Sequence, residues 1–228
     1  IDYAPSTSIL GGGIGAFTSG NVSLGGHAYG TITDDTVNTA VMLNANVDSV
    51  VWSNGLSTGA WVTNSDDTAA GNWVLKNGKT SANFLAGDMI EFNDSFDNTN
   101  DSIDNPTSLG SPQTVDISAG NVSPTAVTFN NSSVAYTING TGGGIATGSL
   151  TKNGSAAVTI NSANTYTGGT IINNGTLTVN GSLADSGAVT INGGTYAVGS
   201  NDTVGAVTLT GGTISGAGTL TGASYALQ

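Results

Sequence analysis

The second half of the chain contains an internal repeat, and a repeat restricts the possible folds more than any other feature of a sequence. A tetrapeptide of Ala, Val, Thr and an apolar residue occurs four times, with spacings of 31, 31 and 18 residues. Its copies begin at Ala126, Ala157, Ala188 and Ala206. A second element, Gly-Gly-Thr, begins at Gly168, Gly193 and Gly211. Periods of this size are typical of solenoids, in which each coil stacks on the next.

The residues inside each repeat indicate strands. Short runs such as Thr176-Leu177-Thr178-Val179 alternate polar and apolar residues and favour β-branched types, which is typical of strands with one buried face. Sharp turns are frequent, because Asn-Gly pairs supply positive φ angles. The seven pairs begin at Asn54, Asn77, Asn139, Asn153, Asn174, Asn180 and Asn192. Hairpins could use the same turns, but the repeat favours an all-β solenoid. We expect Thr, Asn, Val and Ile to form ladders along its axis.

Composition excludes several classes of function. The 228 residues include 35 Gly, 3 Lys, 15 acids and no Cys, which gives a net charge of -12. Nucleic-acid binding requires clustered cations, so no nucleic-acid partner is expected. Without Cys there are no disulfides, thiolate zinc sites or catalytic thiols. No apolar run approaches the roughly 18 residues of a membrane span, so no membrane insertion is expected. Only 8% of residues are charged and the mean hydropathy is +0.06, which argues against disorder.

The chain divides into three stretches by composition. Residues 1–59 are irregular, with strand-like pieces, and are interpreted as an N-terminal β segment that caps the solenoid or donates a strand. Residues 60–111 contain most of the acids and are predicted to form loop-rich early coils. Residues 112–228 are predicted to form regular coils. One continuous solenoid is the simplest interpretation, and a division near Ser111-Pro112 is the alternative.

One segment resembles a known family. The run Asn164-Thr165-Tyr166-Thr167-Gly168-Gly169-Thr170-Ile171-Ile172-Asn173-Asn174-Gly175-Thr176-Leu177 resembles the autotransporter-associated repeat of bacterial autotransporter passengers. Trp61 with Trp73, residues 84–92, 127–131 and 148–152 follow in the order typical of the module before that repeat. The resemblance covers residues 61–220. It implies a right-handed parallel β-helix that is extracellular and carried on a cell-surface protein.

The acidic segment 88–104 is a candidate metal site. It holds six carboxylates within 17 residues, together with several amides. Calcium takes about 6–8 oxygen ligands in flexible geometry, so we consider a calcium site. Its ligands would be Asp94, Asp97, Asp101 and Asp104. The segment lacks the Gly and Glu of a helix-loop-helix site, and a solvated acidic loop is the alternative. Asp88 is interpreted as a structural turn residue before a strand.

Two enzymatic interpretations were considered. Residues 55–59 match the G-x-S-x-G pattern around Ser57, and His27 could complete a triad. That motif requires a strand-turn-helix, and no helix is predicted. Polysaccharide-active β-helices use clustered acids and a base, which here would be Lys76 or Lys79 beside the 88–104 carboxylates. We expect no enzymatic activity and no cofactor.

The three tryptophans are candidates for ligand binding. Trp52, Trp61 and Trp73 could stack on a sugar, but we expect them to fill the core or cap the first coils.

Residues 208–220 still have the pattern of a regular coil, so this end is expected to continue or to dock on another chain. We therefore expect an extracellular, non-enzymatic structural protein that assembles with itself end to end into a surface or matrix fibre. The alternative is an adhesin stalk that presents residues 60–111 to a surface glycan or receptor.

Overall fold

All regular elements of the protein are β-strands. The computed structural model describes residues 22–23, 28–35, 40–63, 71–77, 81–96 and 107–228, and their side chains from residue 48 onward. Within these residues there is no α-helix, as the alternating pattern predicts. It follows that the described part of the chain holds no helix long and apolar enough to cross a membrane.

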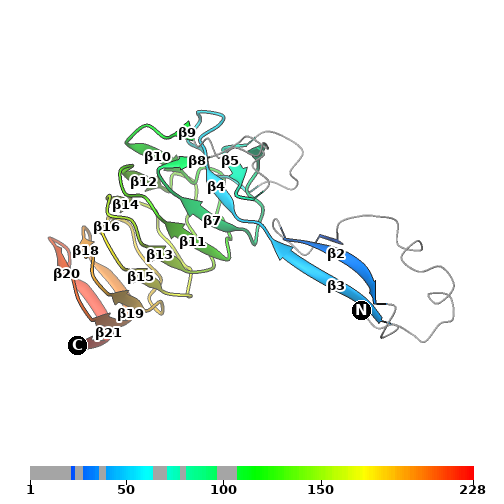
Figure 1. The fold of residues 1–228 in the computed structure, drawn as a ribbon. Coiled ribbons are helices and arrows are strands. Elements are labelled where there is room, and N and C mark those ends of the chain that lie inside the picture. Colours follow the sequence, from blue (N-terminus) through cyan, green and yellow to red (C-terminus); the bar gives the residue numbers. More distant parts are fainter. Residues whose placement is uncertain (1–21, 24–27, 36–39, 64–70, 78–80, 97–106) are drawn as a thin grey trace.

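Stacked coils form two long sheets that face each other (Figure 1). Ten strands make the larger sheet, in the order β21-β19-β17-β15-β13-β11-β7-β4-β5-β6. Their bounds are β4 (Val50–Trp52), β5 (Trp73–Leu75), β6 (Ser81–Ala82), β7 (Met89–Phe92), β11 (Ala126–Phe129), β13 (Leu150–Lys152), β15 (Thr170–Ile172), β17 (Val189–Ile191), β19 (Asp202–Leu209) and β21 (Leu220–Leu227). From β4 and β7 to β21 the neighbours in this order are parallel. The predicted parallel β-solenoid is confirmed.

The second sheet has six parallel strands in the order β10-β12-β14-β16-β18-β20. These are β10 (Gln113–Asp116), β12 (Tyr136–Asn139), β14 (Val158–Ile160), β16 (Thr176–Val179), β18 (Thr195–Val198) and β20 (Thr213–Gly216). From β10 onward the strands of the two sheets alternate along the chain, so each of these coils contributes one strand to each sheet. Between β7 and β10 a small antiparallel pair, β8 (Ser95–Phe96) and β9 (Thr107–Ser108), leaves this pattern.

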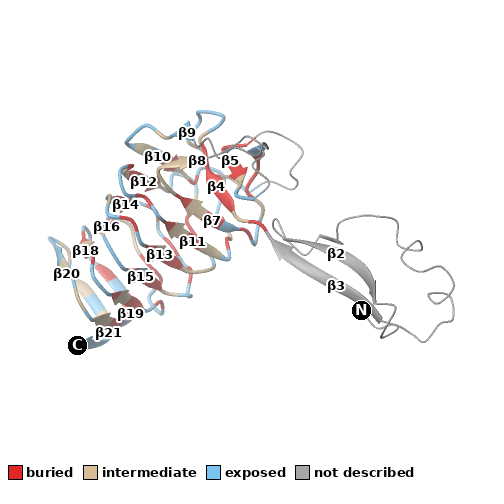
Figure 2. Ribbon diagram, in the orientation of Figure 1, coloured by how far each residue is buried: buried red, intermediate tan, exposed pale blue. Residues whose placement is uncertain are grey.

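In-register stacking builds the core (Figure 2). Alternate residues of the strands from β11 to β18 are buried, and the register places like residues on like residues in successive coils. In the six-stranded sheet one such stack is apolar throughout its middle, formed by Val115, Ile138, Ile160, Val179 and Val198. Outward positions of the same strands carry Thr and Asn. This alternation explains why a chain with few large apolar residues can bury a continuous core.

The N-terminal end of the solenoid differs from the regular coils. Here β4, β5 and β6 pair antiparallel, and Trp52, Trp61 and Trp73 are buried with Phe84 and Phe92. The rings of Trp52 and Trp73 meet edge to face with centroids 5.0 Å apart. This burial agrees with the prediction that the tryptophans fill the core or cap the first coils, and it leaves none of them available as an exposed sugar platform.

A hairpin projects from this end (Figure 1). It is an antiparallel sheet in the order β1-β2-β3, formed by β1 (Val22–Ser23), β2 (Ala28–Asp35) and β3 (Ala40–Val47). Strands β2 and β3 pair along their whole length of 8 residues each. The strand β3 leads into β4 of the solenoid, so the hairpin is connected directly to the first coil.

Candidate functional site

Asp94 is the only one of the four predicted calcium ligands that the structure describes; Asp97, Asp101 and Asp104 lie outside the described residues. Its carboxylate accepts backbone N–H bonds from Ser132, Ser133 and Val134 at 2.8–3.0 Å. Burial acts to raise the pKa of Asp94, but the hydrogen bonds from these three amides outweigh it and hold the pKa below its usual value.

These contacts give Asp94 a structural role at the corner between β11 and β12. The carboxylate joins the segment after β7 to a turn almost forty residues later in the chain. No group of three or more His, Asp or Glu side chains with metal-binding geometry occurs among the described residues. Calcium at this segment therefore stays a prediction. Asp88 accepts the N–H of Leu85 at 2.7 Å, which agrees with its interpretation as a turn residue.

Of the residues named in the two enzymatic interpretations, the structure describes Ser57 and Lys76 but not His27 or Lys79. Ser57 lies in an exposed turn with a φ of 55°, followed by a loop and an isolated β-bridge at Ala60, so the strand-turn-helix of a nucleophile elbow is absent from these residues. Lys76, the one candidate base within the described residues, forms an ion pair with Glu91.

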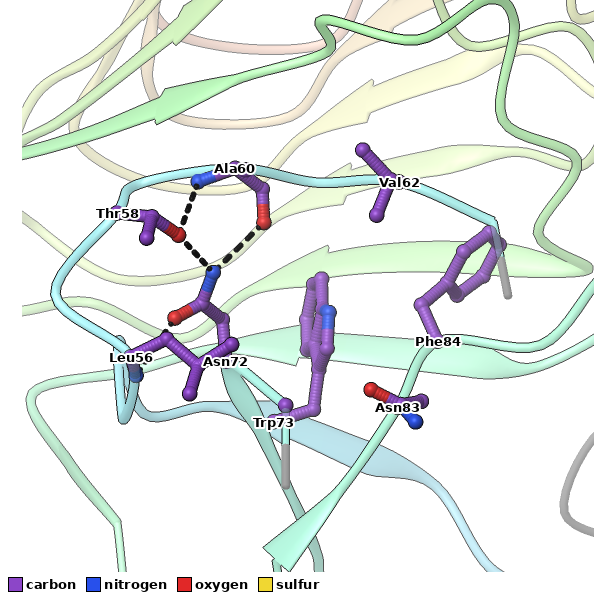
Figure 3. Close-up of a pocket in the computed structure, with 9 residues that line it drawn as sticks. Leu56, Thr58, Ala60, Val62, Asn72, Trp73, Asn83 and Phe84 are labelled. Carbon is purple, nitrogen blue, oxygen red and sulfur yellow. Dashed lines mark hydrogen bonds between the residues drawn. The ribbon is translucent and has the colours of Figure 1, made fainter. Parts of the chain in front are cut away.

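A small pocket opens at the N-terminal end (Figure 3). Its volume is about 70 Å³, whereas sites for small organic ligands measure roughly 300–1,000 Å³. Polar groups at its rim form hydrogen bonds with one another. Asn72 donates to the Thr58 hydroxyl and the Ala60 carbonyl at 2.9 Å each and accepts the N–H of Leu56 at 2.9 Å. Trp73 and Phe84 form the apolar wall. With no acid or base in its lining, the pocket can hold a few water molecules but offers no catalytic group.

Two ladders of Asn side chains run from coil to coil along the described part of the solenoid. The first amide ladder consists of Asn130, Asn153, Asn173 and Asn192, each placed directly after a strand of the ten-stranded sheet. After Asn130, each Asn donates from Nδ2 to the Oδ1 of the Asn in the preceding coil, at 3.0 Å from Asn153, 2.7 Å from Asn173 and 2.7 Å from Asn192. The hydroxyl of Thr210 continues the ladder by donating to Asn192 at 3.0 Å.

A carboxylate lies at the head of this ladder. Asn130 donates to Oε1 of Glu91 at 3.0 Å, and Lys76 pairs with Oε2. Burial acts to raise the pKa of Glu91, but the bonds and charge of Lys76 and the amides outweigh it and lower the pKa. All amide N–H groups point towards this end, so the negative charge faces the positive ends of the aligned amide dipoles. Glu91 and the ladder therefore stabilise each other.

A second amide ladder, Asn139, Asn161 and Asn180, follows the strands of the other sheet. Asn161 donates to Asn139 at 2.8 Å, and Asn180 donates to Asn161 at 3.0 Å. The strand register places Asp116 one coil before Asn139, but its carboxylate accepts hydrogen bonds from the backbone N–H and the hydroxyl of Thr141. The sequence predicts ladders of this kind; the ladder hydrogen bonds confirm them for Asn.

Sequence reasoning missed one buried residue, Lys152. It points inward from β13, is fully buried, and donates from Nζ to the Gly154 carbonyl. Burial lowers the pKa of its ammonium to about 8, against which Asp94 acts in the opposite direction. Knowledge of the strand register would have revealed that Lys152 is buried, because it pairs with Phe129 and Ile172 at an inward position.

Comparison with known proteins agrees with the fold. Residues 150–179, from the start of β13 to the end of β16, match the passenger-associated-transport-repeat family. No curated protein and no solved structure matches the chain. The match includes the segment for which the sequence resemblance was strongest. Residues 150–179 thus carry a passenger-associated-transport-repeat, which is built into the parallel β-solenoid.

Proposed function

We propose that the chain is a non-enzymatic structural segment of a secreted or cell-surface protein, a stiff solenoid that assembles end to end into a fibre. The observation that carries the proposal is the edge of the ten-stranded sheet at β21. This strand spans 8 residues, and its Tyr225 and Leu227 side chains are 55% and 78% exposed. An exposed edge strand presents unpaired backbone groups that favour pairing with another strand.

The two ends of the solenoid support a directional assembly. At the N-terminal end, β5 and β6 pair antiparallel beside the tryptophan cluster, and the sheet ends there in β6, an edge strand of only 2 residues. The projecting hairpin offers an alternative strand, because β3 is the edge strand of its own sheet and has the same 8-residue length as β21. Pairing β3 of one copy with β21 of the next is a heterologous contact that repeats without closing, and such contacts build filaments.

Negative-stain electron microscopy over a concentration series tests this proposal. The Leu227→Asp variant places a charge on the β21 edge, and Leu56→Asp is the matched control because Leu56 is 51% exposed but lies at the N-terminal turn. We expect filaments for the unmodified chain and for Leu56→Asp, and single rods for Leu227→Asp. Single rods at every concentration of the unmodified chain would overturn end-to-end assembly.

A second candidate function, an adhesin stalk, is favoured by the β8–β9 excursion. This antiparallel pair leaves the solenoid between Phe92 and Gln113, so the coils present it at the side of the rod. A surface glycan or cell-surface receptor would bind there. Glycan-array binding by the unmodified chain that is lost when residues 95–108 are replaced by a short turn would support the stalk function over the fibre.

A further inference from the structure

Seven Asn-Gly pairs make this chain vulnerable to deamidation, and the structure distributes that risk unevenly. In an Asn-Gly pair the backbone nitrogen of Gly can attack the Asn side-chain Cγ, because Gly has no Cβ to obstruct the approach. Four of the pairs begin at residues of the two amide ladders: Asn139, Asn153, Asn180 and Asn192. Asn174 begins a fifth pair but belongs to neither ladder.

Asn174 has a different environment from the ladder residues. Asn153, Asn180 and Asn192 are exposed, like Asn174, so the difference lies in hydrogen bonding: Oδ1 of Asn174 accepts the N–H of Gly175, the next residue, at 2.8 Å. This contact holds the attacking nitrogen beside the carbonyl that it would attack. Gly175 has a φ of 68°, a conformation that glycine adopts at no steric cost.

The ladder residues lack this arrangement. The Asn153 side chain donates to Asn130 and accepts from Asn173, so its amide is fixed between two neighbouring coils. The nitrogen of Gly154 donates to the Phe129 carbonyl at 3.1 Å. Gly181, which follows Asn180, likewise donates to Ile160 at 3.1 Å. In these pairs the backbone nitrogen is directed at the previous coil and away from the side chain that it would attack.

From this contrast we propose that Asn174-Gly175 is a site of spontaneous backbone modification, and that the amide ladders protect the Asn-Gly pairs they contain. The Gly175 nitrogen loses its proton and bonds to Cγ of Asn174, the Cγ–Nδ2 bond breaks, and the departing nitrogen takes up a proton to leave as ammonia. The product is a five-membered succinimide. Water then opens either carbonyl, giving aspartate or isoaspartate, and no other reactant is required.

The consequence for the coil is local. Isoaspartate inserts an additional backbone atom into the corner between β15 and β16, and either product adds a negative charge there. Position 174 is outside the ladder, so the hydrogen bonds of Asn173 to Asn153 and Asn192 do not depend on it. Among the Asn-Gly pairs of the regular coils, the proposed reaction would thus be directed to the Asn174 corner and kept out of the amide ladders.

Peptide mapping by mass spectrometry tests the proposal on the full chain, incubated at mildly alkaline pH. A misplacement of about 1 Å can cost on the order of 10²-fold in rate, so we expect Asn174 to react at least about tenfold faster than Asn153 or Asn192. In urea the pairs should react at similar rates. Equal rates at Asn174 and Asn153 in the folded protein, or an unchanged difference in urea, would overturn the assignment.

The Asn161→Ala variant tests the protective role of the ladder. Asn161 is the middle member of the second amide ladder, and it precedes Ser162, so it is not itself part of an Asn-Gly pair. Its removal frees the amides of Asn139 and Asn180. We expect deamidation at both to rise several-fold against Asn174 as the internal reference, and to stay unchanged in Thr159→Ala, which alters an outward residue of the same coil. Unchanged rates at both positions in Asn161→Ala would contradict protection by the ladder.

Discussion

The two ends of the solenoid are stabilised in different ways. The N-terminal coils contain large aromatic rings that contact one another across several strands, including Trp61 with Phe84 and Phe92. The later coils use smaller side chains in register, with Asn ladders outside and Val and Ile stacks inside. A coil held mainly by its neighbours can be extended by adding another coil, whereas an interlocked aromatic cluster closes the end that it occupies. In the proposed fibre, this difference would make the tryptophan cluster the closed end and β21 the extendable end.

The largest effect is expected from truncating an aromatic of the closed end. Trp61 is fully buried among Trp73, Phe84 and Phe92, so Trp61→Ala should lower the free energy of unfolding by about 3–5 kcal/mol. Ile160→Val in a regular coil should cost only about 0.5–1.5 kcal/mol. Urea unfolding followed by tryptophan fluorescence and circular dichroism measures both. Equal losses would contradict the distinction between the two ends.

The stability of the regular coils should depend on pH through Lys152. Its pKa is lowered to about 8 in the folded protein from an ordinary value of 10.5, so between these values the unfolded chain binds more protons than the folded one. Stability should therefore rise with pH in this window, by at most roughly 3 kcal/mol. Unfolding between pH 8 and pH 9 measures the slope, below the ordinary tyrosine pKa of 10.0 at which the unfolded chain begins to lose further protons. In Lys152→Met the slope should disappear; its persistence would assign the effect to another group.

The next largest loss of stability is expected at the corners of the coils, where the backbones of neighbouring coils stack closely. A Cβ on Gly154 would overlap the carbonyl oxygen of Asn131 in the previous coil, so Gly154→Ala should cost about 1–3 kcal/mol of unfolding free energy. Gly110 is the matched control, because a Cβ there meets no atom within 4 Å. Thermal unfolding of the two variants should differ clearly, and a Gly154→Ala protein as stable as Gly110→Ala would show that the corners are looser than described.

The smallest expected effect lies at the head of the first amide ladder. Replacing Glu91 with Gln removes its ion pair with Lys76 and the charge that faces the ladder, at a cost of about 1 kcal/mol or less. Because the pKa of Glu91 is lowered, this stabilisation is present at neutral pH and is lost as the pH falls through the folded pKa. Denaturant unfolding of Glu91→Gln and Lys76→Gln at pH 7 and in acid measures it; a Glu91→Gln effect that is independent of pH would exclude the charge as its source.

Much of the fold could be predicted because the sequence patterns that specify it are short and recur along the chain. Alternation in runs such as residues 176–179 gives strands with one buried face, and the repeat places those strands in successive coils. The antiparallel pairing of β4, β5 and β6 could not be predicted, because residues 50–82 are outside the repeat and their pairing depends on contacts with the aromatic cluster.

The candidate sites were harder to predict for the same reason. The acidic composition of residues 88–104 pointed to calcium, whereas the contacts of Asp94 lie with the backbone of residues 132–134, and no local pattern reveals such a partner. The sequence predicts that Asn residues form ladders. It does not predict that Glu91 accepts a hydrogen bond from the first Asn of the ladder, because that contact depends on the register between β7 and β11.

Hydrogen exchange at β21 tests the extendable end most directly. The backbone amides of Leu220–Leu227 lie on the edge strand, whereas those of β15 (Thr170–Ile172) lie between two parallel neighbours. If β21 accepts a strand from another copy, its outward amides should exchange fast in dilute solution and become protected as the concentration rises, while β15 stays protected throughout. Fast exchange along β21 at every concentration would contradict end-to-end assembly.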